Sequence, residues 1–207
     1  MSNFFLFGMI IFDALTFVAC LRYFLKSKNR QIGPLVLWFG SRFLSVLFPY
    51  NLRVYMGWKT EYLYSFSVLL EGFLMYYFFL LLLSKKHWFA KFLFMIPLSI
   101  FVVEFYFLKH YYNVMYVTHV FYYAFVSALL IWLITREKIN QPLQYFINLL
   151  LVFHVSVFFF MLNLSFLTTS YNLAAYIYPI FWLTYVVFDL LSILYFRKQY
   201  VHCQEQV

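Results

Sequence analysis

Seven ionisable side chains lie within long apolar stretches of this 207-residue chain. They are four acids, one arginine and two histidines: Asp13, Arg42, Glu71, Glu104, His119, His154 and Asp189. Carboxyl groups near an arginine and a histidine could bind a proton, a cation or a polar ligand, or could take part in acid–base catalysis. The same groups could instead pair with one another inside the protein. The sequence leaves both alternatives open.

Metal and cofactor chemistry finds little support in the spacing of these residues. The five histidines are never closer together than nine residues, whereas diiron and zinc sites on helices need close histidine pairs. Lysine is missing from the middle of every apolar stretch, so a retinal Schiff base has no attachment point. Haem ligation would need His119 and His154 at equal depth, and helical rise separates them by about 8 Å. We therefore expect no metal and no cofactor.

The elements that carry these side chains are long apolar helices. Hydrophobic residues make up 66% of the chain and charged residues only 11%, far from the average of soluble proteins. The apolar residues fall into seven blocks, each long enough to cross about 30 Å of hydrocarbon as a helix. The predicted fold is a single transmembrane domain, 1–207, an all-α bundle of seven helices over 4–24, 33–50, 62–83, 91–108, 114–134, 143–165 and 173–196.

The distribution of positive charge predicts the orientation of this bundle. The connections after the first, third and fifth helices, together with the C-terminal tail, hold 11 of the 15 Lys and Arg residues. The opposite side holds three, and Arg42 lies within the second helix. The positive-inside rule then places the N-terminus outside and the C-terminus in the cytoplasm. Because the net charge of +8 is spread over helix ends, we expect contact with membrane lipids and no binding of nucleic acid.

Most of the ionisable residues belong to stripes of polar or small side chains three and four positions apart, which predicts that they face the bundle interior. His154 fits less well, because Gln144 and Asn148 share a different face of the sixth helix. Counting from the helix ends puts four of them near the midplane: Asp13, Arg42, Glu71 and His154. Glu104 and His119 fall in the outer quarter as a candidate pair, and Asp189 falls in the inner third.

The cost of burying charge requires that the ionisable groups of this layer face inward, pair with one another or be neutral. Each unpaired charge at the bilayer centre costs about 3 kcal/mol even on the lenient insertion scale. The simplest structural solution pairs Arg42 with Glu71 or Asp13 and leaves the remaining acids protonated or hydrogen-bonded. Four carboxyl groups against one arginine alternatively indicate a site for protons or a bound cation.

An internal repeat of three helices on either side of a linker helix is a further alternative. A shift of 108 residues places 27–35 on 135–143, two basic connections that each lead into a Pro-Leu pair and the next helix. Two identities in nine positions are weak support, and any two basic connections would share part of them. The 3+1+3 arrangement remains open.

The third helix carries a resemblance to a known group of proteins. It opens with Leu63-Tyr64, carries Glu71 at its middle and ends in aromatic residues up to Phe79. In this it resembles a family of small, uncharacterised bacterial seven-helix membrane proteins, which implies a cell membrane location in the bacterial inner membrane. Where that family usually has a histidine and a second tyrosine, this chain has Ser65 and Ser67. The resemblance singles out Glu71 and implies no activity.

Three functions are compatible with these features. We expect a non-enzymatic sensor or accessory component that uses its polar core to bind a ligand or sense protonation and passes the change to a protein partner or a second copy. A small transporter or a proton or cation pathway would use the midplane carboxyl groups. An intramembrane enzyme acting on lipid is the third alternative, although the chain carries no recognisable catalytic motif.

Overall fold

The structure, a computed structural model, describes residues 3–56, 61–83, 92–93, 95–104, 106, 116–169 and 171–205. These residues form helices joined by short connections, and no strand occurs among them. The elements in chain order are α1 (Asn3–Ser27), the short 3-10 helix η1 (Arg30–Ile32), α2 (Gly33–Met56), α3 (Glu61–Leu82), α4 (Met95–Val103), α5 (Tyr116–Arg136), α6 (Gln141–Thr169) and α7 (Tyr171–Glu205). The all-helical prediction is confirmed.

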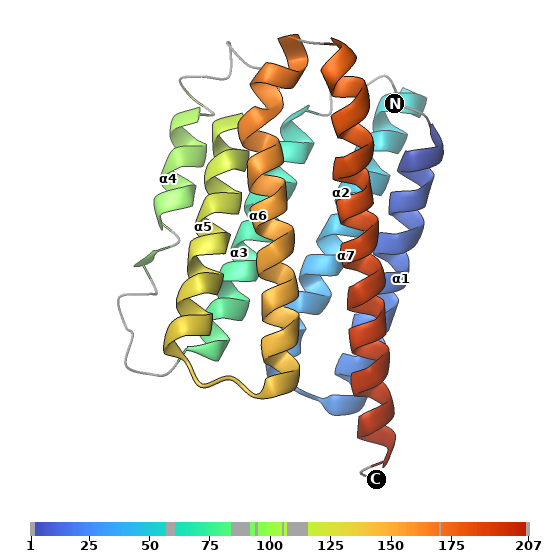
Figure 1. Cartoon of the computed structure of the whole chain (residues 1–207), viewed down its shortest axis with the longest axis vertical. Helices are drawn as coiled ribbons and strands as arrows, with labels where there is room; N and C mark the ends of the chain where they lie inside the picture. Colours follow the sequence, from blue (N-terminus) through green and yellow to red (C-terminus); the bar gives the residue numbers. More distant parts are fainter. Residues whose placement is uncertain are drawn as a thin grey trace.

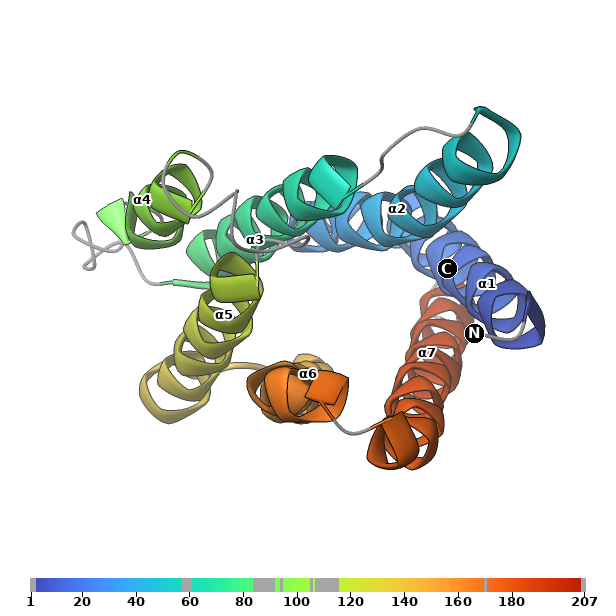
Figure 2. The same ribbon diagram turned by 90° about the horizontal axis from the view of Figure 1, so that it is seen from above.

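Six of the helices form a closed ring, seen from above in Figure 2. The helices α1, α2 and α3 follow one another around it, α3 packs against α5, and α5, α6 and α7 complete the circle back to α1. Helix α4 lies outside the ring, against α5 and α3. This order is compatible with a 3+1+3 arrangement in which α4 is the linker. The starts of α2 and α6, Gly33 and Gln141, are 108 residues apart, but the duplication itself stays a prediction.

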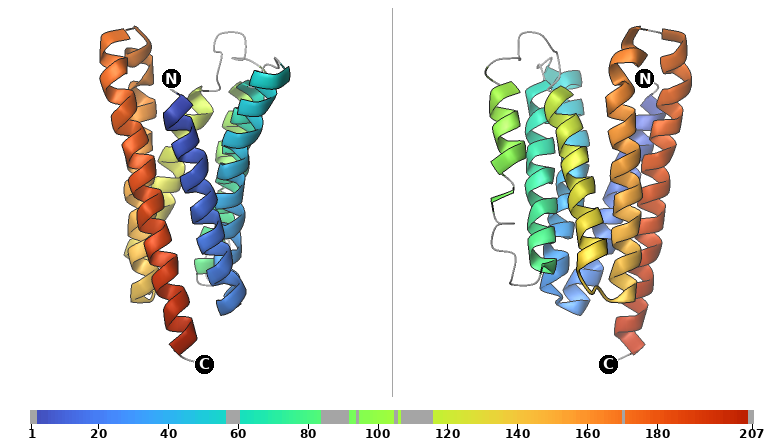
Figure 3. Two further views of the ribbon diagram at one scale, coloured as in Figure 1. Left: turned by 90° about the vertical axis from the view of Figure 1, so that its right-hand side faces the viewer. Right: turned by 60° about the vertical axis from the view of Figure 1, so that its left-hand side comes forward.

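The long helices run side by side along one axis (Figures 1 and 3). Many large apolar side chains are exposed on their outer surface. Four of them contain stretches long and apolar enough to cross a membrane: Phe7–Ser27, Val117–Arg136, Gln141–Asn163 and Pro179–Gln204. Leu37, Val152 and Leu194 are each about 60% exposed on the outside of the bundle. Apolar side chains on the outer face are typical of helices that contact lipid. The described residues thus form a helical bundle with several membrane-span candidates, whereas seven spans and their orientation stay predictions.

Several helices are longer than the sequence predicted. The ends expected at 24, 50, 165 and 196 lie at Ser27, Met56, Thr169 and Glu205. The largest difference is in α7, where Arg197 and Lys198 were interpreted as the start of a polar tail. Charged residues do not end a helix in the absence of a Gly or Pro signal, so the helix continues. Its 35 residues extend the C-terminal end beyond the other helices (Figure 1).

The fourth helix is the least complete match to the prediction. Of the expected range 91–108, the described helix covers Met95–Val103, nine residues. At about 1.5 Å per residue this length spans about 14 Å, less than half of a bilayer core. The rest of the expected range lies largely outside the described residues.

Two tight connections are determined by local sequence. Lys28 adopts a positive φ of 52° after α1, and its N–H donates to the carbonyl oxygen of Phe24 at 2.8 Å, which closes the helix end. The Asn29 side chain then accepts from the N–H of Gln31 at 3.0 Å and starts η1. Asn140 has the same role before α6, where its side chain accepts from the N–H of Leu143 at 3.2 Å.

Candidate functional site

The centre of the ring is organised around the guanidinium of Arg42. Arg42 lies in α2, and only 4% of its surface is exposed. Its Nη2 lies 2.8 Å from Asp13 Oδ1 in α1, and its Nη1 donates a hydrogen bond of 3.2 Å to Asp189 Oδ1 in α7. Both aspartates are buried. One cation therefore joins three helices, including the first and the last of the chain, through two carboxyl groups.

The two carboxyl groups meet the guanidinium with different geometry. The contact with Asp13 is the shorter one, but neither Asp13 oxygen makes an aligned hydrogen bond to a described residue. Asp189 makes the longer contact and accepts an aligned hydrogen bond from Arg42. Asp189 thus interacts with Arg42 through a hydrogen bond and through opposite charge, whereas Asp13 interacts with it mainly through opposite charge.

The helical stripes explain why these groups meet. In α1, Asp13, Thr16 and Cys20 are fully buried at spacings of three and four residues. The Thr16 hydroxyl donates to the Phe12 carbonyl at 2.8 Å and lies 3.4 Å from the backbone carbonyl oxygen of Asp189. A polar stripe on α1 therefore faces the polar stripe of α7 along the contact between the first and last helices.

Five aromatic rings surround the guanidinium. Arg42 Cζ lies between 5.1 and 5.8 Å from the ring centroids of Trp38, Phe39, Phe153, Tyr185 and Phe188. Cations are attracted to the faces of such rings, most strongly where water is excluded. The rings come from α2, α6 and α7, so the same contacts also pack these helices. The cage stabilises the charge of Arg42 in addition to its carboxylate partners.

His154 of α6 is fully buried beside this cage. Its Nδ1 donates to the carbonyl oxygen of Leu150 at 2.8 Å, since a carbonyl oxygen only accepts. Its Nε2 lies 3.5 Å from the Tyr122 hydroxyl, and the ring stacks on Trp38 at 5.8 Å between centroids. The Tyr122 hydroxyl can then donate to Nε2 of a neutral imidazole. His154 therefore lies on the inner side of the ring, although the polar stripe of α6 did not indicate its face.

Glu71 of α3 is 7% exposed and lies on the inner side of the ring. Its carboxyl group interacts electrostatically with Arg42 and lies beside the hydroxyl of Ser45. No salt bridge joins it to Arg42 among the described contacts, which run to Asp13 and Asp189. Of the two alternative partners expected for Arg42, Asp13 makes the salt bridge, and Asp189 is a further partner that the sequence did not indicate.

Glu104 and His119 belong to a different part of the fold. The Glu104 carboxylate is buried and accepts hydrogen bonds from the backbone N–H groups of Val117, at 2.8 Å, and of Thr118. These N–H groups have no partner within α5, so Glu104 caps the start of that helix. His119 follows in the first turn of α5 and is also buried. Glu104 thus joins α4 to α5.

The sequence named Asp189 as a candidate residue but did not place it beside Arg42. Asp189 was placed too deep toward the cytoplasm because α7 was taken to end at 196. Tyr123 and Tyr185, whose hydroxyl oxygens are 3.4 Å apart, extend the polar layer from α7 to α5. Both tyrosines belong to the polar stripes of their helices, and that spacing was the signal available for them.

The assembled site can hold charge and protons in an apolar surrounding. Arg42 carries one positive charge, and Asp13, Asp189 and Glu71 would carry three negative charges if all were ionised. Among the residues that the structure describes, no group of three His, Cys, Asp or Glu side chains could hold a metal ion. The carboxyl groups outnumber the one guanidinium, so burial of the site favours the uptake of protons.

Comparison with known proteins found no matching family model, no similar curated protein and no similar solved structure.

Proposed function

We propose that this chain is a multi-pass protein of the cell membrane, with seven spans, the N-terminus outside and the C-terminus in the cytoplasm. The four long apolar helices and the apolar outer surface support a membrane location. The excess of Lys and Arg at the end of the bundle that carries the C-terminus supports the orientation. The resemblance of the third helix to bacterial seven-helix proteins favours the bacterial inner membrane.

Within this membrane protein, we infer a sensor or accessory component whose helix packing responds to protonation of its core. The observation that carries this proposal is the single guanidinium of Arg42 shared between Asp13 at 2.8 Å and Asp189 at 3.2 Å. Two carboxylates on one cation leave a surplus negative charge in an apolar cage, and Glu71 adds another. Burying such charges is costly, so bound protons neutralise the surplus.

Proton release would change how α1 and α7 pack. With one proton on the pair, Asp13 and Asp189 together balance Arg42, and the ring is closed by attraction. With that proton lost, two like charges on different helices repel each other in a low-dielectric surrounding. The titratable groups that interact with the pair are Arg42 on α2, Glu71 on α3 and Tyr185 on α7. His154 on α6 and Tyr122 and Tyr123 on α5 lie further along the same polar layer, next to Arg42 and Tyr185. Movement of α1 against α7 would carry the signal to a protein partner or to a second copy.

A proton or cation pathway is the second candidate, favoured by the carboxyl groups and by the ring order of a 3+1+3 arrangement. The aromatic cage around Arg42 weighs against it, because five rings pack where a pathway would need water. An enzyme acting on lipid is the third candidate. His154 weighs against it, because the side chain is fully buried and its Nδ1 is occupied by the Leu150 carbonyl.

Infrared spectroscopy of the protein in lipid tests the proposal directly, because a protonated carboxyl group has its own C=O stretching band. We expect such a band in the wild type at neutral pH and its decrease in Asp13→Asn or Asp189→Asn. Glu137→Gln is the matched control, because this acid lies outside the polar core and its loss should leave the band unchanged. A wild type without a protonated carboxyl band at neutral pH would contradict the proposal. Steady proton flux in sealed vesicles would instead favour the pathway.

A further inference from the structure

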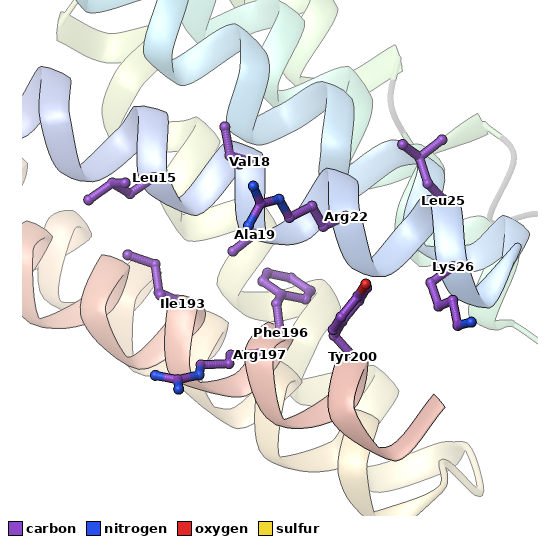
Figure 4. Close-up of a pocket in the computed structure, with 10 residues that line it drawn as sticks. All are labelled: Leu15, Val18, Ala19, Arg22, Leu25, Lys26, Ile193, Phe196, Arg197 and Tyr200. Atoms are coloured by element: carbon purple, nitrogen blue, oxygen red, sulfur yellow. The ribbon is translucent and has the colours of Figure 1, made fainter. Parts of the chain in front are cut away.

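A groove of about 640 Å³ runs between α1 and α7 near the C-terminal end of the bundle (Figure 4). Its residues on α1 recur at positions 15, 18, 19, 22, 25 and 26, which is one face of a helix. Phe196 of α7, fully buried, forms part of its lining and packs against Phe39 and Phe146 of the core. The groove is therefore backed by the rigid interior of the ring.

The groove combines positive charge with an apolar wall. Arg22 and Lys26 come from α1 and Arg197 from α7, and all three are exposed. Figure 4 shows the two arginines on the two helices that border the groove. None of the residues that line it is acidic, so its charge is not balanced from within. Leu15, Val18 and Ile193 supply exposed or partly exposed apolar surface next to these charges.

The depth of these residues matches one leaflet of a bilayer. Arg22 follows Asp13 by nine residues, or about 14 Å of helix, and Arg197 follows Asp189 by eight residues, or about 12 Å. Half of a hydrocarbon core is about 15 Å thick. If the Asp13–Arg42–Asp189 layer lies at the midplane, both arginines reach the headgroup boundary, and Leu15, Val18 and Ile193 lie at the depth of acyl chains.

We propose that this groove binds one anionic phospholipid of the cytoplasmic leaflet. Arg22, Lys26 and Arg197 hold the phosphate and its headgroup, and an acyl chain lies along Leu15, Val18 and Ile193. Charge complementarity selects an anionic lipid over a neutral one. A second copy of the chain is disfavoured as occupant, because a symmetric contact through this face would bring two sets of the same three cations together. A free anion would leave the apolar wall unused.

The lipid site rests on the proposed membrane location but not on protonation of the core. An experiment can therefore disprove the lipid site without disproving the sensor, and the reverse. The test counts lipids that stay bound to the intact protein by native mass spectrometry, after reconstitution with phosphatidylglycerol or phosphatidylcholine. We expect one phosphatidylglycerol to be retained on the wild type, with phosphatidylcholine lost. Inorganic phosphate added in excess should not displace the lipid.

The double variant Arg22→Gln/Arg197→Gln removes two charges from the groove and should weaken phosphatidylglycerol binding about 30-fold. Arg30→Gln/Arg136→Gln is the matched control, because it removes two exposed arginines from the same end of the bundle but outside the groove. It should leave the bound lipid in place. Equal loss of lipid in both double variants would overturn the proposal, because the attraction would then be diffuse.

A third variant tests the apolar half of the groove without changing its charge. Val18→Trp fills the wall at an exposed position and should lower retention of phosphatidylglycerol while the three cations remain. Unchanged retention in this variant, or displacement of the lipid by inorganic phosphate, would show an anion site in place of a lipid site. A stable dimer that excludes lipid from this face would equally overturn the proposal.

Discussion

Removing the two aspartates one at a time and then together tests whether they share a single cation. Asp13 and Asp189 both contact Arg42, at 2.8 and 3.2 Å, and all three side chains are at most 4% exposed. Replacing either one by Asn leaves Arg42 with one carboxylate, a balanced pair. We therefore expect each single variant to change the free energy of unfolding by no more than about 1 kcal/mol.

The double variant Asp13→Asn/Asp189→Asn leaves the buried guanidinium without a close counter-charge. Loss of the partner of a buried charge typically costs about 3–5 kcal/mol. Glu71 makes no salt bridge with Arg42 among the described contacts and does not replace both aspartates. The double variant should thus exceed the sum of the single variants by at least about 1–3 kcal/mol, which is a coupling energy.

Thermal or denaturant unfolding of the protein in mixed micelles, followed by circular dichroism, measures the four free energies of this cycle. The single variants serve as controls for the change of a carboxylate to an amide. Additive effects would refute the idea that one cation is shared. A cost of about 3–5 kcal/mol in each single variant would show that both carboxylates are needed at the same time.

Three further predictions concern other parts of the fold. Glu104→Ala removes the cap of α5 and should lower the free energy of unfolding by about 1–2 kcal/mol, with faster amide exchange at Val117 and Thr118. Glu104→Gln keeps a hydrogen-bond acceptor and should lower it less. Equal amide exchange in the two variants would contradict the capping role. Gly40→Leu should lower the free energy of unfolding by about 1–3 kcal/mol, because the larger side chain disturbs the contact between α1 and α2. Even a Cβ at this position would lie 3.2 Å from the ring of Phe17. A variant as stable as the wild type would show that the helices separate easily. A reporter fused to the C-terminus should be active in the cytoplasm and inactive outside it, and the opposite result would overturn the orientation.

The inward positions of the polar residues were predictable wherever a helix carried a clear stripe. Asp13 and Arg42 lie in runs of small or polar side chains at spacings of three and four, and both are buried. The sixth helix shows why this reasoning has limits. Its outer and inner faces both carry apolar side chains, such as the exposed Val152 and the buried Leu150, so hydrophobic periodicity distinguishes the two faces poorly. Gln144 and Asn148 therefore did not show which face of the helix is the inner one.

The position of a residue along the axis of the bundle was harder to predict than whether its side chain faces inward. Asp189 lies 18 residues after Tyr171 and 16 before Glu205, close to the middle of α7. The sequence suggested an end at 196 because charged residues follow, and this moved the expected centre of the helix away from Asp189. The role of Glu104 was not predictable, because capping requires knowing which helix start comes to lie beside the carboxylate.

The contact between the first and last helices has a consequence for how the protein is made. Asp13 and Arg42 leave the ribosome early and can enter the membrane as a neutral pair on a helical hairpin, whereas Asp189 follows 147 residues after Arg42. At synthesis rates of about 5–20 residues per second, the pair waits about 7–30 s for its third member. During that interval the ring is open on the side that α7 will close. Assembly factors or lipids have this time to act on the unfinished bundle, and the arrival of α7 adds the second carboxyl group to Arg42 and closes the ring.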